Sequence, residues 1–416
     1  MKKACIKEGI NLYTVCDKKF KTMRACVMLH RPLSRDEVTK NTLLISVMRM
    51  QCEKFKSSQK ISVRLEELYG ADLIARASKY GERQIIKLGI QTVADSAVGE
   101  NNFKNAMELL LNMLLSSGTG KSFSEDIVQT EKKNIKDAIL AQKNDKRSYS
   151  VLRLQQEMCN TEAYGINPMG YTQDLESIDA KGLYSHYKKI LSESRIDIIF
   201  TGNFEEESAL EAAKELAAGL CARTPQAITE RNTEDAAMVR RITDKMDVTQ
   251  GKLCMGFRMK NGAGRERYPE TIVFNTVFGG SATSKLFENV REKLSLCYYV
   301  SSSVDRLKEI MIVRSGVEFE NFEKAQEEIM LQLEKVCSGD ITPEEEDAAK
   351  KQLVGAYTAN CDSEAAMEEY CIMQILLGTD VSVEDMIESI KNVRRGDIAR
   401  AARECVLDTV YCIEGE

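Results

Sequence analysis

The chain has 416 residues, of which 43% are hydrophobic and 29% are charged, and its formal net charge is −6. This length is enough for two or three domains that each bury a core, and the composition is that of a globular protein. A net charge this small for the length gives no electrostatic basis for binding nucleic acid or an anionic membrane.

The start of the sequence and the cysteines bear on location. Residues 1–8 carry lysines with no apolar stretch behind them, so we expect no signal peptide, and the most apolar helix, near 109–115, is too short to span a bilayer. The 13 cysteines are scattered and form no C-x-x-C pair. This pattern predicts free thiols in a reducing cytoplasm.

Hydrophobic periodicity predicts an alternation of strands and helices in the first half. In chain order we expect a strand at 23–29, helices at 38–50 and 63–69, strands at 73–78 and 84–92, helices at 103–116 and 124–143, a turn at 165–170, a helix at 178–191 and a strand at 195–200. Residues 222–248 then combine Pro225 with many charges and little periodicity, which is typical of a linker. We therefore predict an N-terminal domain at 1–221 and a C-terminal domain at 249–416.

The second half of the sequence repeats the first. A set of residues at 102–114 recurs 219 positions later: Asn102, Phe103, Ala106, Glu108 and Leu114 correspond to Asn321, Phe322, Ala325, Glu327 and Leu333. The strand at 25–28 is echoed at 253–256, and the strand that closes the first half is echoed at 410–413. Because the matches keep the same order, we infer two copies of one α+β domain that arose by internal duplication.

One stretch of the second half, 278–300, carries the clearest functional pattern. A glycine turn leads into N-cap candidates, then a short helix with apolar residues four apart, then a strand rich in aromatic and β-branched residues. The residues are Gly279 and Gly280 in the turn, Ser281, Thr283 and Ser284 as cap candidates, Leu286, Val290 and Leu294 on one helix face, and the strand 296–300.

This arrangement brings Arg291 and Tyr298, seven residues apart, to one surface. Arginine and tyrosine can both donate hydrogen bonds to a carbonyl oxygen that gains negative charge. The plainer alternative is a solvated helix charge and a half-buried strand residue.

The spacing Gly-Gly, Ser-x-Leu-Phe-x-x-x-Arg-Glu-Lys, Leu-x-Tyr resembles the C-terminal signature of the pitrilysin-like (M16, inverzincin) zinc peptidases. The resemblance implies paired homologous domains of the LuxS/metallohydrolase-like type. It also implies that Arg291 and Tyr298 hold the substrate at a zinc site built elsewhere, with the backbone of Gly279, Gly280 and Ser281 lining the chamber.

The zinc half of that machinery is missing from the sequence. The family's H-x-x-E-H motif needs two histidines four residues apart, whereas this chain has only His30 and His186. Aligning the approach to the motif helix places the motif at 46–50 and the later ligand at 138. The substituted positions are Ser46, Arg49, Met50 and Ala138. A methionine thioether is a poor zinc ligand, and an arginine repels a cation, so we predict no metal and no other cofactor in this chain.

His30 and His186 are expected to be a strand-end residue and a packed or surface residue. The resemblance therefore implies a non-catalytic subunit of a heterodimeric M16-type zinc peptidase, inactive alone. It would supply Arg291 and Tyr298 to a peptide substrate in the site of an H-x-x-E-H-bearing partner. The alternative is a self-associating scaffold of the same fold that binds peptides or another protein and cuts nothing.

Overall fold

The computed structural model describes residues 1–416 except 100, 119, 222 and 231–237. The chain forms two compact units that both draw on each half of the sequence. Unit 1 comprises Met1–Leu140, Ile166–Thr229 and Ser363–Met373, and unit 2 comprises Ala141–Gly165, Glu230–Asp362 and Gln374–Glu416. Part of the predicted linker, 222 and 231–237, lies outside the described residues, and its 240–246 portion forms a strand.

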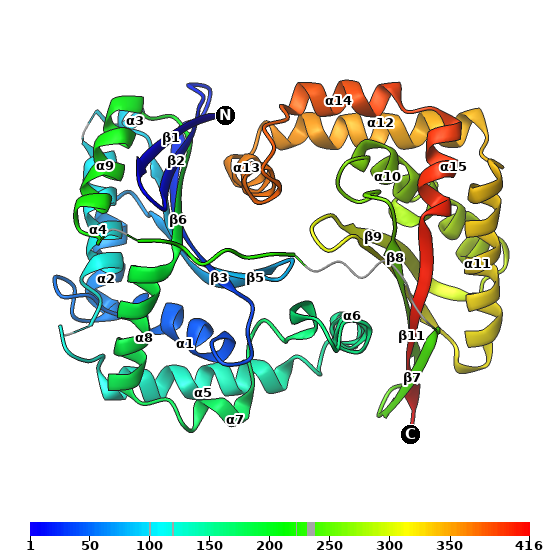
Figure 1. Ribbon diagram of the computed structural model, residues 1–416, viewed down its shortest axis with the longest axis horizontal. Coiled ribbons are helices and arrows are strands. Elements are labelled where there is room, and N and C mark those ends of the chain that lie inside the picture. Colours follow the sequence, from blue (N-terminus) through cyan, green and yellow to red (C-terminus); the bar gives the residue numbers. More distant parts are fainter. Residues whose placement is uncertain (100, 119, 222, 231–237) are drawn as a thin grey trace. The chain divides into compact units, whose positions relative to one another are not determined.

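Unit 1 is a mixed sheet with most of its helices on one face (Figure 1). Its strands are β1 (Lys2–Lys7), β2 (Ile10–Cys16), β3 (Thr22–Pro32), β4 (Asp72–Tyr80), β5 (Arg83–Val93) and β6 (Arg195–Gly202). Its helices are α1 (Val38–Met48), α2 (Ser58–Glu67), α3 (Asp95–Val98), α4 (Asn102–Leu115), α5 (Glu125–Ala141), α7 (Thr172–Leu175), α8 (Ala180–Glu193), α9 (Glu206–Ala218) and the first part of α13 (Glu364–Leu377). Helices α4, α8 and α9 are among those on that face.

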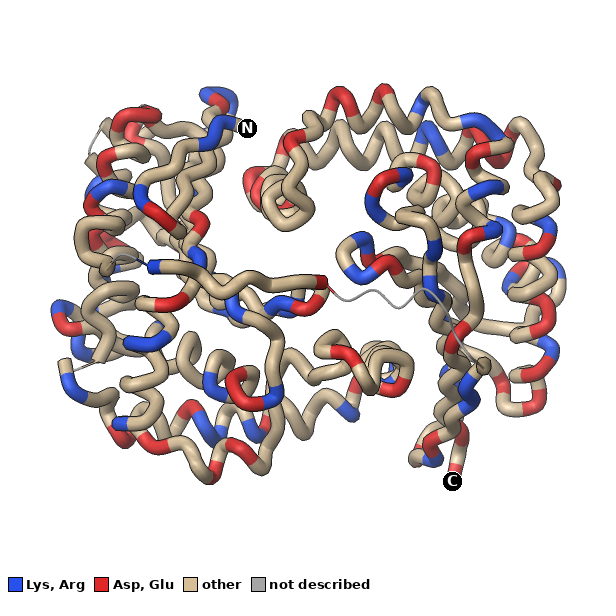
Figure 2. The backbone as a smooth tube through the Cα atoms, in the orientation of Figure 1, with Lys and Arg blue, Asp and Glu red and all other residues tan. Residues whose placement is uncertain are grey.

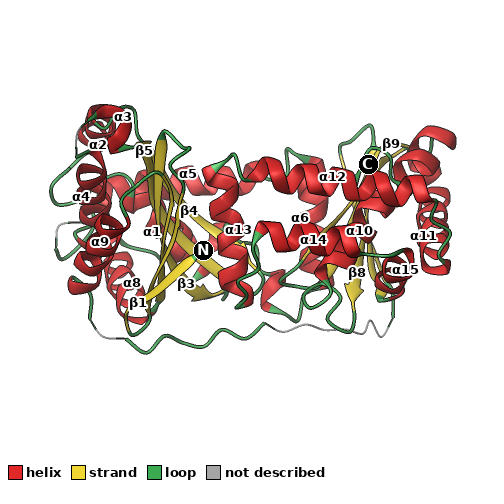
Figure 3. Cartoon of the chain, turned by 90° about the horizontal axis from the view of Figure 1, so that it is seen from above, coloured by secondary structure: helices red, strands yellow, loops and turns green. Residues whose placement is uncertain are grey.

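The core of unit 1 follows from the alternation of side chains along its strands. On β3, Ala25 and Val27 are buried in the hydrophobic cluster that includes α4 and α9. Seen from above, these two helices lie on one face of the strands (Figure 3). The alternate residues Arg24 and His30 are not part of that cluster and reach carboxylates: Arg24 pairs with Glu368 of α13, and His30 pairs with Asp197 of β6.

Unit 2 has the same kind of architecture. Its strands are β7 (Arg240–Met246), β8 (Gly251–Met259), β9 (Cys297–Asp305), β10 (Ile310–Val317) and β11 (Cys405–Gly415). Its helices are α6 (Lys146–Met158), η1 (Ala163–Gly165), α10 (Tyr268–Asn275), η2 (Thr276–Gly280), η3 (Leu286–Lys293), η4 (Phe319–Asn321), α11 (Phe322–Ser338), α12 (Pro343–Asn360), the end of α13, α14 (Val383–Asn392) and α15 (Arg395–Arg403).

The two sheets confirm the predicted α+β fold and its duplication. The strand order β2-β6-β3-β5-β4 of unit 1 corresponds to β7-β11-β8-β10-β9 of unit 2, and β1 extends the first sheet. In both units the first and second strands of this series are parallel, and the second and third strands are antiparallel. Sequence analysis did not identify β1, β2, β7 or β10. Strands β1 and β7 are short and polar, whereas β2 and β10 are apolar on both faces and so lack a clear alternation.

Charge is distributed in keeping with the small net charge. Lysine and arginine are interspersed with aspartate and glutamate along the backbone of both units (Figure 2). In the described part of the chain, no helix combines the length and the apolar content needed to cross a membrane.

Candidate functional site

The glycine turn belongs to η2, a π-helical segment that continues α10. A Cβ atom on Gly279 would lie 2.7 Å from the hydroxyl of Ser302 on β9, and one on Gly280 would lie 2.7 Å from the amide nitrogen of Asn275. Ser302 itself donates a hydrogen bond of 2.8 Å to Oδ1 of Asn275. The glycines are therefore needed because η2 packs too closely on β9 and on its own preceding turn to admit a side chain.

Sequence analysis expected Leu286, Val290 and Leu294 on one helix face, and the structure differs at Leu294, which lies just after the helix. Leu286 and Val290 are fully buried, whereas Leu294 is 50% exposed. Leu294 lies just past η3, which ends at Lys293; its amide bonds to the carbonyl of Asn289, five residues back, and the chain then turns at Ser295, whose φ is 50°. Leu294 therefore belongs to the exposed turn and not to the buried face of the helix.

Arg291 lies in the last turn of η3 and is partly exposed. Its guanidinium carbon is 4.6 Å from the ring centroid of Phe287, and its Nε is 3.6 Å from a carboxylate oxygen of Glu292. Burial raises the pKa of the nearby Cys297 thiol, and the positive charge of Arg291 partly offsets that rise. The guanidinium therefore lies close to the start of β9.

Tyr298 lies on β9, the edge strand of the unit 2 sheet, and 57% of it is exposed. Cys297 pairs with Val317 and Tyr299 pairs with Gly316, so Tyr298 is the extra residue of a β-bulge. Bulges of this kind redirect one side chain from the regular alternation of the strand. The Tyr298 hydroxyl donates a hydrogen bond to the Glu318 carboxylate, which raises the pKa of the phenol.

The structure thus places Arg291 and Tyr298 on either side of the tight turn at Ser295, whose φ is 50°. Among the described residues, no hydrogen bond or ion pair joins the two side chains. Gly279 is buried, Gly280 is exposed and Ser281 is half-buried, so of these three residues Gly280 and Ser281 reach the surface. Two π-helical segments and a bulge shape this stretch, and π-helical turns occur frequently at functional sites.

Glu318 is the residue of this cluster that sequence reasoning missed. It follows β10, twenty residues after Tyr298, and belongs to no part of the signature. Only the pairing of β9 with β10 brings it beside the tyrosine. A sequence signal existed in principle, because an antiparallel hairpin with a known register identifies facing residues.

The positions aligned with the zinc motif lie on and after α1 and on α5. The Ser46 hydroxyl donates 3.1 Å to the carbonyl of Thr42, Arg49 is exposed at the end of α1, and Ala138 is exposed on α5. The whole of α1, from Val38 to Met48, carries no histidine, cysteine, aspartate or glutamate, so a shifted alignment along the helix finds no ligand either. The donor set does not fit zinc.

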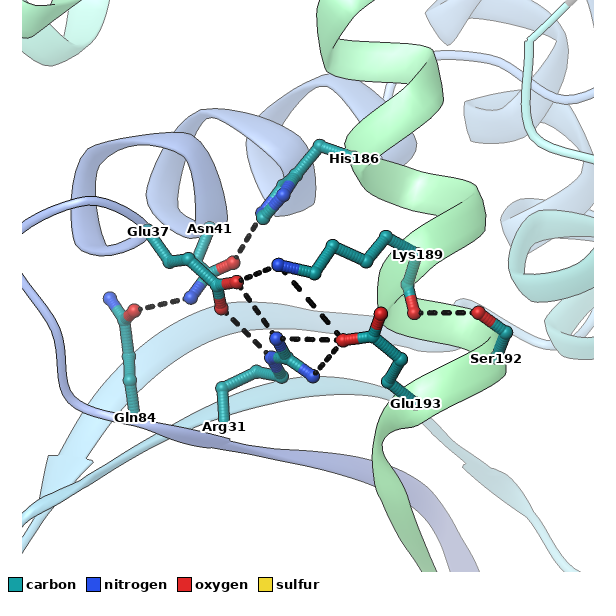
Figure 4. Close-up of polar contacts among 8 residues, drawn as sticks. All are labelled: Arg31, Glu37, Asn41, Gln84, His186, Lys189, Ser192 and Glu193. Atoms are coloured by element: carbon teal, nitrogen blue, oxygen red, sulfur yellow. Dashed lines mark hydrogen bonds and ion pairs between the residues drawn. The ribbon is translucent and has the colours of Figure 1, made fainter. Parts of the chain in front are cut away.

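The described residues as a whole contain no cluster of three or more histidine, cysteine, aspartate or glutamate side chains able to hold a metal ion. The start of α1 is instead occupied by a polar network (Figure 4). Arg31 holds Glu37 through two hydrogen bonds of 2.9 and 2.8 Å, and Lys189 of α8 donates to the same carboxylate at 2.7 Å. Glu193 lies 3.3 Å from Arg31.

His186 also belongs to this network and is buried. Its Nε2 lies 2.7 Å from Oδ1 of Asn41, and the Asn41 amide donates 2.8 Å to Gln84. Because the asparagine oxygen can only accept, Nε2 carries the proton and the ring is the donor. Burial lowers the pKa of His186 to about 4, so the ring is neutral near pH 7. Because these contacts join β3, α1, β5 and α8 to one another, their role is structural.

Comparisons with known proteins agree with this architecture. Residues 177–353 match the family described as the peptidase M16 inactive domain. Over 410 residues the chain is 30% identical to the probable inactive metalloprotease YmfF of Bacillus subtilis (strain 168), covering 98% of this chain and 96% of that protein. It is also 25% identical over 264 residues to the uncharacterized zinc protease YmxG of the same organism, covering 60% of this chain and 61% of that protein.

Solved structures show the same fold along the whole chain. A conserved protein from Enterococcus faecalis V583 superimposes with a TM-score of 0.91 at 29% identity, covering 100% of this chain and 98% of the other. A peptidase M16 inactive domain protein from Pseudomonas fluorescens gives a TM-score of 0.85 at 17% identity, covering 100% and 97%. The fold, the absence of an H-x-x-E-H motif from the sequence and these similarities lead to one conclusion: the chain belongs to the M16 peptidase family and resembles its inactive members.

Proposed function

We propose that this chain is the non-catalytic subunit of a heterodimeric M16-type zinc peptidase that acts on peptides. The zinc belongs to a partner subunit with an H-x-x-E-H motif, and this chain supplies Arg291 and Tyr298. The observation that carries the proposal is the contrast between the two units. Helix α1 has no side chain that could bind zinc, whereas η2, η3 and the β9 bulge keep Arg291 and Tyr298 at the surface.

The chemistry required of the pair is modest. Zinc in the partner would supply an activated water for attack on a peptide carbonyl. Donors already aimed at the carbonyl oxygen would stabilise the negative charge that develops on it. Arg291 brings a permanent charge, and Tyr298 brings a hydroxyl that exchanges its hydrogen bond to Glu318 for one to the substrate. That Bacillus subtilis contains both an inactive relative and a relative named as a zinc protease supports a two-chain arrangement.

The test is reconstitution with the H-x-x-E-H protein that copurifies from the native cell. We expect Tyr298→Phe and Arg291→Ala to leave assembly intact and to lower peptide cleavage by about a hundred- to a thousandfold. Matched controls are Tyr299→Phe, the neighbouring tyrosine on the same strand, and Lys293→Ala, a cation two residues after Arg291. Full activity of intact Tyr298→Phe and Arg291→Ala complexes would remove the catalytic role.

A scaffold that binds peptides or proteins without catalysis is the second candidate, and one observation favours it. Both side chains already have partners within unit 2, since Tyr298 donates to Glu318 and Arg291 stacks on Phe287. In that case self-association replaces the heterodimer, and the same variants change neither cleavage nor assembly. For either function we propose a cytoplasmic location, which the scattered cysteines favour.

A further inference from the structure

A groove runs along the outside of η3, where this π-helix packs beside α11. Its apolar end has a volume of about 470 Å³ and is lined by Leu294, Leu296, Lys324, Glu327, Glu328 and Leu331. We call these six residues the leucine groove. A second, polar groove of about 480 Å³ has Asn289 and Gln332 in its lining. Gln332 donates a hydrogen bond of 2.6 Å to Glu328 of the leucine groove and accepts one of 3.1 Å from Asn289.

The apolar end is unusual because two leucines remain open to solvent side by side. Leu294 is 50% exposed and Leu331 is 44% exposed, and both line the same groove. Leu294 lies at the end of η3, in the turn that leads into β9, outside the buried face of that helix. A single exposed leucine needs no explanation, and here two of them share one hollow with charged side chains around it.

Charge identifies the kind of occupant. The segment 318–328, which leads into α11 and forms its first turns, contains five glutamates and one lysine: Glu318, Glu320, Glu323, Glu327 and Glu328, with Lys324. Glu327, on the groove rim, has no hydrogen-bond or ion-pair partner within the described part of the chain. A ligand with positive charge next to an apolar side chain would satisfy both the leucines and this carboxylate.

We propose that the leucine groove binds a polypeptide segment of another protein in which an apolar side chain is followed closely by lysine or arginine. The apolar side chain contacts Leu294 and Leu331, and the basic side chain pairs with Glu327. Neither Arg291 nor Tyr298 lines the leucine groove, so the proposal does not depend on the proposed catalytic role. It can be measured on this chain alone.

The test uses fluorescence anisotropy with the whole chain and three labelled peptides of equal length. One contains Leu-Arg-Arg between glycine and serine residues, one replaces both arginines by glutamate, and one replaces the leucine by serine. We expect the first to bind saturably, the other two to bind at least tenfold more weakly, and added salt to weaken the first.

Variants then locate the site. Leu294→Ser and Leu331→Ser should each weaken binding of the Leu-Arg-Arg peptide about tenfold, while the matched control Leu140→Ser, a leucine 55% exposed on α5 of unit 1, should change nothing. Glu327→Arg should reverse the preference and bind the glutamate-bearing peptide more tightly. Because all four positions are exposed or lie at a groove rim, unchanged melting temperatures serve as the folding check.

Three results would overturn the proposal. The first is equal binding of all three peptides, which would indicate non-specific adsorption. The second is insensitivity to both leucine variants, which would place the peptide elsewhere. The third is a concentration-dependent dimer that Leu294→Ser dissociates, which would make a second copy of this chain the occupant.

Discussion

At the scale of single residues, the spacing of the sequence identified Arg291 and Tyr298 but could not identify what holds them. A motif records residues that are near one another in sequence. The neighbour that fixes the Tyr298 hydroxyl, Glu318, comes from the next strand, and the ring direction depends on a β-bulge that the sequence pattern did not reveal. The π-helical winding of η3, which ends just before the exposed Leu294, has no local signature either.

The hydrogen bond between Tyr298 and Glu318 has a direct consequence for titration. A carboxylate acceptor favours the protonated phenol, so it raises the pKa of Tyr298. Replacing Glu318 by glutamine should lower that pKa toward the ordinary tyrosine value. Nuclear magnetic resonance of ¹³C-labelled tyrosine follows the titration, with Tyr298→Phe assigning the signal. An unchanged titration curve in Glu318→Gln would show that the hydrogen bond does not persist in solution.

His186 should give the protein a pH dependence of stability in mildly acidic solution. Its pKa is about 4 in the folded chain against 6.5 in the reference state, because the buried ring resists protonation. Between these values the unfolded chain binds the proton and the folded chain does not, so the free energy of unfolding falls as the pH drops. The shift corresponds to a loss of about 3 kcal/mol between pH 6.5 and pH 4.

His186→Gln keeps a donor for Asn41 and cannot titrate. We expect the variant to lose this part of the pH dependence, measured by urea unfolding at half-unit pH steps. Carboxylates whose pKa is lowered by ion pairs, such as Asp197, act mainly below pH 4 and should affect both proteins equally. Parallel curves for the two proteins between pH 4 and 6.5 would contradict this assignment.

At the scale of elements, the duplication was visible in the sequence because it repeats the spacing of core residues. The repeated segments 102–114 and 321–333 correspond to α4 and α11, which occupy equivalent positions in the two units. What the sequence could not show is which core each helix joins. Helix α6 belongs to the first half of the sequence but packs in unit 2. Helix α13 belongs to the second half, but most of it packs in unit 1. Local periodicity gives the apolar face of a helix and not its partner.

Two segments, 141–165 and 363–373, each pack in the unit that is built mainly from the other half of the sequence; we call them the exchanged segments. Each is held by a buried carboxylate that lies between an arginine and a lysine. In unit 1, Glu368 lies 2.7 Å from Arg24 and also contacts Lys87. In unit 2, Glu162 lies 2.7 Å from Arg258 and also contacts Lys308. Despite the cost of burial, these cations lower the pKa of both carboxyl groups. The same kind of contact thus appears once in each unit, with Glu368 on α13 and Glu162 in the loop between α6 and η1.

Glu368→Gln should destabilise unit 1 because it leaves two buried cations without a counter-charge. Breaking a buried ion pair in this way typically costs about 3–5 kcal/mol. The neighbouring Glu369, which bonds to Tyr80 at 3.1 Å and is half-exposed, provides the control, and Glu369→Gln should cost less than about 1 kcal/mol. Chemical denaturation measures both. Equal effects of the two substitutions would mean that the buried carboxylate contributes no more than a surface ion pair.

At the scale of the whole molecule, the chain is a member of a peptidase family, but its own helix α1 offers no zinc ligands. We therefore predict that the purified chain cleaves no peptide and binds no stoichiometric zinc. Inductively coupled plasma mass spectrometry and a quenched peptide substrate measure the two properties. One zinc per chain together with cleavage that a chelator abolishes would contradict the prediction.

The exchange of helices also predicts how the chain responds to a break in its backbone. A specific protease site inserted between Gln226 and Ala227, both exposed, would separate the two halves of the sequence. Each unit would still contain a segment from the other fragment. The two fragments should therefore elute together in native size-exclusion chromatography and separate only in denaturant. Independent elution of two folded fragments would show that the exchanged segments are dispensable.

The position of 363–373 within unit 1 sets an order of events during synthesis on the ribosome. Residues up to Thr229 contain every strand of the first sheet, but the carboxylate that neutralises Arg24 and Lys87 is the side chain of residue 368. At about 5–20 residues per second, the nascent unit waits roughly 7–30 s for that segment. During this interval the two cations lack their counter-charge, so unit 1 reaches its final stability only when the chain is nearly complete.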